Sequence, residues 1–86
     1  MKTEIAEGKN TQANKYYSHA EGYDAGAIGQ SSHAEGEHTR SNGIGSHAEG
    51  VGTSTFGYAT HSEGSGTQAI GDYSHAEGYN TIANGQ

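Results

Sequence analysis

Short stretches of this chain alternate between small residues and larger polar residues. Ser18, Ala20 and Gly22 alternate with His19 and Glu21, and the same alternation returns along the sequence. A period of two is typical of a β-strand, whose successive side chains point to opposite faces of a sheet. We therefore expect an all-β fold built from short strands.

The strand pattern repeats every fourteen residues. The consensus unit is Ser-His-Ala-Glu-Gly followed by nine further residues; the fifth unit has Thr60 and Ser62 in the Ser and Ala positions, and Ile5 takes the His position in the first unit. The period holds without insertion for three columns: Glu7, Glu21, Glu35, Glu49, Glu63 and Glu77; Gly8, Gly22, Gly36, Gly50, Gly64 and Gly78; His19, His33, His47, His61 and His75. Six units in phase predict a repeat architecture in which each unit forms one turn.

A second half-repeat lies inside each unit. Thr67, Ala69 and Gly71 have the spacing of the Ser, Ala and Gly in the next Ser-His-Ala-Glu-Gly segment. Each turn should therefore hold two five-residue strands, each closed by a glycine that suits a corner. Turns stacked about 4.8 Å apart would form a parallel β-solenoid, or β-roll, of six turns and roughly 29 Å. We assign residues 3–86 to this single domain and residues 1–2 to an N-terminal extension.

Alternation also assigns the faces of the roll. A narrow interior accepts only small side chains, so the Ser, Thr, Ala and Gly columns should point inward, and His and Glu outward on one sheet. The outward columns of the other sheet vary: Gln12, Gly26, Arg40, Ser54, Gln68 and Ile82, and then Asn14, Ile28, Asn42, Phe56, Ile70 and Asn84. In the second of these columns Ile28, Phe56 and Ile70 are a candidate apolar stripe for a ligand, although scattered exposed apolar residues are common.

The composition favours a fold held by backbone hydrogen bonds rather than by a large apolar core. Only 29% of the residues are hydrophobic, and Cys is absent, so disulfides are excluded and self-association is one remaining way to stabilise a thin core. The net charge of −6, with four Lys and Arg residues, lacks the positive cluster that phosphate binding needs. No apolar run reaches the length of a membrane span, and no signal peptide is visible. We expect neither a nucleic-acid partner nor membrane insertion.

The pattern Ser-x-Ala-x-Gly, followed by Thr-x-Ala-x-Gly, resembles the head repeat of YadA-like trimeric autotransporter adhesins over residues 3–86. Similar repeats occur in phage tail fibres. The resemblance implies a left-handed parallel β-roll that assembles as a homotrimer. It also implies an extracellular location, on a cell surface or a virion fibre. This chain differs in having His and Glu where the adhesin heads have an apolar Val and Ile.

The His and Glu columns admit three interpretations. They can form a trimer interface, in which neutral His donates a hydrogen bond to Glu of a neighbouring chain. They can bind a divalent metal such as Zn²⁺, but ions stacked every ~4.8 Å would repel one another, so we expect no metal and no other cofactor. They can also be an exposed polar ladder without a partner. The interface residues would be His19, Glu21, His33, Glu35, His47, Glu49, His61, Glu63, His75 and Glu77.

Catalysis is not expected from these columns. Ser18 and His19 are neighbours on opposite faces of one strand, so they cannot form a Ser–His–carboxylate set with Glu21. We expect a structural or adhesive fibre module that presents a repetitive surface, with copies able to stack end to end into filaments. The alternative is a solenoid that binds ice or another repetitive surface. Its Thr column would be Thr11, Thr39, Thr53, Thr67 and Thr81, although alternation places these side chains inside.

Overall fold

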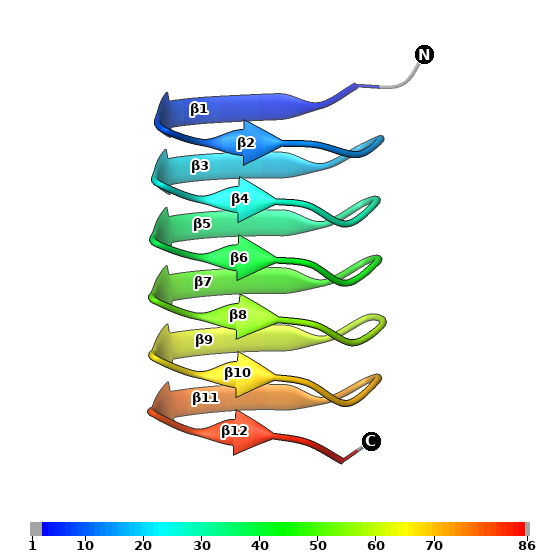
Figure 1. Cartoon of the computed structure of the whole chain (residues 1–86), viewed down its shortest axis with the longest axis vertical. Coiled ribbons are helices and arrows are strands. Elements are labelled where there is room, and N and C mark those ends of the chain that lie inside the picture. Colours follow the sequence, from blue (N-terminus) through cyan, green and yellow to red (C-terminus); the bar gives the residue numbers. More distant parts are fainter. Residues whose placement is uncertain (1–2, 86) are drawn as a thin grey trace.

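The computed structural model describes residues 3–85, which form two parallel six-stranded sheets stacked turn upon turn (Figure 1). One sheet consists of the longer strands β1 (Ile5–Lys9), β3 (His19–Tyr23), β5 (His33–Glu37), β7 (His47–Val51), β9 (His61–Ser65) and β11 (His75–Tyr79). The other consists of β2 (Gln12–Ala13), β4 (Gly26–Ala27), β6 (Arg40–Ser41), β8 (Ser54–Thr55), β10 (Gln68–Ala69) and β12 (Ile82–Ala83). The predicted β-solenoid of six turns is confirmed for these residues; residues 1–2 and 86 lie outside them.

The register follows the sequence repeat. Ala20 pairs with Ala34 and Glu21 with Glu35, so each residue lies beside its counterpart fourteen positions later. The prediction of two five-residue strands per turn was wrong for the second sheet, whose strands have two residues. The turn that returns the chain to the first sheet occupies residues such as 43–45, which leaves little length for the second strand.

The interior consists of small side chains, as predicted. Ala20, Ala34 and Ala48 are fully buried, together with the central residues of the Ser and Thr columns. The buried hydroxyls find partners inside the roll: Ser46 Oγ donates to the Gly43 carbonyl at 2.7 Å, and Thr55 Oγ1 donates to Ser46 Oγ at 2.8 Å. Hydrogen-bonded hydroxyls can therefore fill a core that has little apolar mass.

The repeated glycines Gly8, Gly22, Gly36, Gly50, Gly64 and Gly78 lie in the fourth position of each long strand rather than at the corner. Gly50 has φ +108°, and a Cβ there would overlap the carbonyl oxygen of Gly64 in the next turn. The corner follows two residues later, at left-handed residues such as Asp24 and His38. Gly36 is exposed, contrary to the predicted inward orientation of this column, because its Cβ direction points at the carbonyl oxygen of Gly50 in the next turn rather than into the interior.

The second sheet presents its predicted outward columns, with one exception. Gly26 is buried because the Arg40 side chain lies over it. The Cα atoms span 34 × 23 × 10 Å, so the roll is a flat slab whose thickness is that of two packed sheets. No membrane-crossing helix is found among the residues that the structure describes.

Candidate functional site

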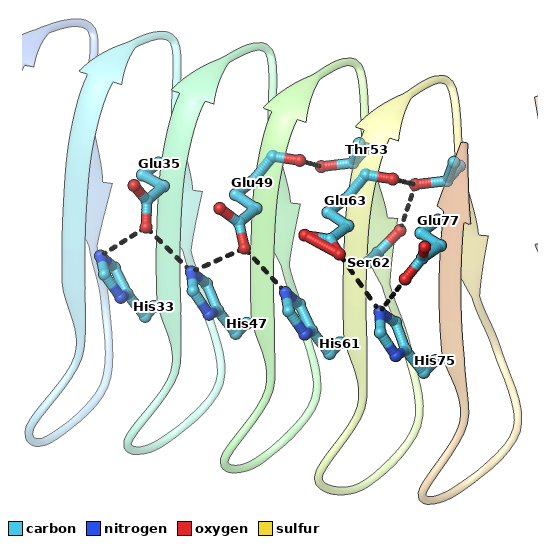
Figure 2. A network of polar contacts seen from close by, with 11 residues as sticks. His33, Glu35, His47, Glu49, Thr53, His61, Ser62, Glu63, His75 and Glu77 are labelled. Carbon is cyan, nitrogen blue, oxygen red and sulfur yellow. Dashed lines mark hydrogen bonds and ion pairs between the residues drawn. The ribbon is translucent and has the colours of Figure 1, made fainter. Parts of the chain in front are cut away.

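A continuous row of His and Glu side chains lies on the outer face of the long-strand sheet (Figure 2). We call this row the His/Glu ladder and define it by Glu7, His19, Glu21, His33, Glu35, His47, Glu49, His61, Glu63, His75 and Glu77. Its central side chains are about one-third exposed, for example 34% for His47 and 33% for Glu49. Each member occupies the first or third position of its strand, so strand alternation brings all of them to one face.

The five imidazole rings are stacked parallel to one another. Neighbouring ring centroids are 4.8, 4.5, 4.8 and 4.7 Å apart from His19 to His75, with interplanar angles between 3° and 12°. The fourteen-residue register causes this stacking, because it gives each ring the same backbone position one turn away. The rings therefore present their Nε2 atoms in the same direction.

Each Nε2 atom points towards ladder carboxylates. His47 Nε2 donates to Glu35 Oε1 at 2.9 Å, and His61 Nε2 donates to Glu49 Oε2 at 2.8 Å. Both hydrogen bonds connect a His to the Glu of the preceding turn. In the centre of the ladder, the Nε2 proton is therefore already shared with a carboxylate of the same chain.

At the N-terminal end of the ladder, the hydrogen bonds between His and Glu are not formed. His19 Nε2 lies 3.6 Å from both Glu7 Oε1 and Glu21 Oε1, which exceeds hydrogen-bond distance. Within the described range, the Nε2 atoms of His19 and His33 are buried and have no hydrogen-bond partner. These nitrogens therefore have unused capacity to bind a donor, a proton or a metal.

Two pKa values in the ladder are shifted. The hydrogen bond from His61 lowers the pKa of Glu49, and partial burial opposes this change. Burial lowers the pKa of His33, and the neighbouring His47 lowers it further. The neutral form of His33 and the charged form of Glu49 are therefore favoured.

The structure brings together all the ladder residues that the sequence predicted, but their observed contacts lie within one chain. The expected His-to-Glu hydrogen bonds between neighbouring chains stay a prediction. The Ser column does not join the ladder. Ser32 Oγ donates to the Gly29 carbonyl at 2.6 Å inside the roll, while the neighbouring His33 points outward.

The two other surfaces suggested by the sequence, the apolar stripe and the Thr column, do not form continuous exposed rows. Phe56 and Ile70 are exposed, but Ile28 is only partly so, and Asn42 separates it from them in the column. The central residues of the Thr column are fully buried: Thr39, Thr53 and Thr67. These three threonines therefore do not form an exposed surface that could match ice.

The edge of the roll carries a charged cluster that the sequence pattern did not predict. Asp24 Oδ2 accepts a hydrogen bond from His38 Nδ1 at 2.7 Å, and Asp24 Oδ1 accepts one from Arg40 at 3.2 Å. The hydrogen bond from His38 lowers the Asp24 pKa, with Arg40 contributing, and desolvation opposes the change. Because Asp24 and His38 are fourteen residues apart, the column alignment could have revealed the pair.

Exposed tyrosines were missed as well. Tyr58 and Tyr73 lie on the opposite edge, with ring centroids 5.7 Å apart in an edge-to-face arrangement. Their columns vary between turns, so the repeat pattern did not single them out.

No protein-family model and no curated protein matches this sequence. The likeness to adhesin heads therefore rests on the motif itself.

Proposed function

We propose that this chain is a stiff structural module of an adhesive or phage-like fibre, which presents a repetitive surface and works as a homotrimer joined along the His/Glu ladder. The main support is the constancy of the ladder between turns. The outward position two residues after each ladder Glu varies freely: Lys9, Tyr23, Glu37, Val51, Ser65 and Tyr79. Both positions lie on the outer face of the same strands, so exposure alone does not explain why His and Glu are retained.

The unused hydrogen-bonding capacity of the ladder supports an interface there. His19 Nε2 and His33 Nε2 are buried without a hydrogen-bond partner in the part of the chain that the structure describes. Buried polar atoms in folded proteins are usually paired. Neighbouring chains around a threefold axis would supply donors and acceptors to these atoms, and each turn would add the same set of contacts.

The backbone supports the proposed stiffness. Successive turns are connected in both sheets, for example by His33 N to Ser46 O and Arg40 N to Thr53 O, each at 2.9 Å. A force along the axis would therefore load many equivalent hydrogen bonds. Such a rod is suited to hold surface groups at fixed spacing.

Light scattering tests the trimer directly, because a trimer has three times the 8.9 kDa mass of the chain. His47→Ala should weaken association more than Asn42→Ala, a matched change on the opposite sheet. An interface group left unpaired costs about 1–3 kcal/mol, and the loss would occur in each of the three chains. A monomeric wild-type protein, or equal effects of the two variants, would contradict the proposed interface.

A further inference from the structure

Two tyrosines form a right-angled corner on one edge of the roll. Tyr58 lies in the turn between β8 and β9, and Tyr73 lies in the turn between β10 and β11, one layer further along the roll (Figure 1). Their ring centroids are 5.7 Å apart, and the angle between the ring planes is 86°. The two residues are 51% and 67% exposed. The corner therefore presents aromatic faces to solvent in two perpendicular directions.

The corner is held in place by the backbone and by Asp72. The Tyr58 N–H donates to Asp72 Oδ1 at 2.9 Å, and the Tyr58 carbonyl accepts a hydrogen bond from the Tyr73 N–H at 2.8 Å. Asp72 and Tyr73 are consecutive, so one dipeptide binds both backbone groups of Tyr58. A carboxylate is thus fixed beside the two rings, and its Oδ2 atom has no hydrogen-bond partner among the described residues.

The sequence around this corner has no positively charged side chain. Residues 41–86 contain no Lys or Arg, whereas they contain four acidic residues: Glu49, Glu63, Asp72 and Glu77. The faces of aromatic rings carry partial negative charge and attract cations. The corner therefore combines two electron-rich faces with a carboxylate that no cationic side chain of this segment neutralises.

Another tyrosine of this chain already has a cation over its ring. Lys9 Nζ lies 6.0 Å from the ring centroid of Tyr23, at the outer limit of a cation–π contact. Tyr58 and Tyr73 have no equivalent lysine in their half of the sequence. Their faces are therefore available to a cation that comes from outside the chain.

We propose that Tyr58, Tyr73 and Asp72 bind a quaternary ammonium group of the choline type. The corner is open to water, so it favours a cation that is weakly hydrated; the compact ammonium of a lysine is strongly hydrated. A guanidinium would pair best with both oxygens of a carboxylate, but Asp72 Oδ1 already accepts the Tyr58 N–H. A trimethylammonium group needs no acceptor, because it has no N–H, and its methyl groups can contact the rings while Asp72 balances the charge.

Titration of the full chain with choline chloride, at constant ionic strength, tests the proposal through the NMR signals of the tyrosine rings. Two exposed rings and one carboxylate should give a dissociation constant of about 10 mM. The signals of Tyr58 and Tyr73 should shift to saturation. Those of Tyr16 and Tyr17 should not, because this second tyrosine pair, with centroids 6.4 Å apart, follows Lys15 rather than an acidic residue.

Three variants separate the contributions of the rings and the carboxylate. Tyr73→Ala should weaken choline binding about two- to fivefold, the strength of one exposed cation–π contact. Asp72→Asn retains an acceptor for the Tyr58 N–H and removes only the charge, and it should weaken binding as well. Tyr17→Ala is the matched control, which removes an exposed tyrosine from the other pair and should leave binding unchanged. Circular dichroism would establish that each variant is folded.

A neutral isostere of choline, in which carbon replaces the nitrogen, distinguishes charge from shape. It should cause little shift at Tyr58 and Tyr73. The proposal is overturned if choline causes no saturable shift of these signals, if the isostere shifts them equally, or if Asp72→Asn binds choline as tightly as the wild type. The site uses no residue of the His/Glu ladder, so these outcomes are independent of the trimer, which light scattering assesses separately.

Discussion

Alanine in place of Gly50 probes the closest approach between successive turns. Gly50 has φ +108°, and its missing Cβ leaves room for the carbonyl oxygen of Gly64. Gly45 is a matched control: its φ of +66° also lies in the left-handed region, but a Cβ there would have no neighbour within 4 Å. The two substitutions add the same methyl group, and only one of them adds it against the backbone of the next turn.

The expected losses differ in size. Gly45→Ala carries the left-handed penalty alone, about 1–2 kcal/mol. Gly50→Ala adds backbone strain of about 1–3 kcal/mol and weakens at least one hydrogen bond between turns, worth about 1 kcal/mol, which together give about 2–4 kcal/mol. A chain of this length has a free energy of unfolding of about 4–13 kcal/mol, so the second variant loses a large part of it.

Urea unfolding followed by circular dichroism measures the difference. Gly50→Ala should have the lower midpoint, and it should populate the unfolded state before Gly45→Ala does. Equal losses for the two variants would refute the close stacking of glycine on glycine between turns. A Gly50→Ala protein as stable as the wild type would refute it more directly.

Further predictions concern the core and the ladder. Thr67→Val should destabilise the fold by about 1–3 kcal/mol, because it leaves the Ser62 hydroxyl without its 2.6 Å partner. Thr39→Val should be neutral or stabilising in the same urea assay, since Thr39 Oγ1 is buried without a hydrogen-bond partner among the described residues. Because the pKa of His33 is lowered in the folded protein, its neutral form stabilises the fold above about pH 6.5, and this stabilisation is lost as the pH falls. In the same urea assay, the free energy of unfolding of His33→Gln should therefore fall less between pH 7 and pH 5 than that of the wild type. If charged Glu holds a trimer, light scattering should show dissociation below about pH 4, and a trimer intact at pH 3 would contradict that role.

Much of the fold could be predicted because the repeat aligns the chain with itself. The columns of Ala20 and His19 are constant enough to assign register, interior and outer face from alternation alone. The corners were harder to predict, because non-glycine residues such as Tyr17 and Ala59 adopt positive φ there, and their residue types do not indicate this conformation. Tertiary packing between turns imposes these conformations, which local preference disfavours.

The candidate site was predicted in its membership but not in its chemistry. Column positions show that His47 and Glu35 share a face. They do not show that His47 donates to the preceding turn while His19 stays between two carboxylates. That difference depends on side-chain rotamers, which a periodic sequence does not encode.

The uniform register has a consequence for how this molecule can change over generations. Because the strand residues pair with their counterparts fourteen positions away, losing or duplicating one unit would leave all remaining columns aligned. Most insertions in a compact protein must be accommodated in loops, whereas here the gain or loss of a whole fourteen-residue unit preserves the fold. Recombination between similar units could therefore alter the reach of the protein in equal increments, while the groups on its faces continue to diverge independently.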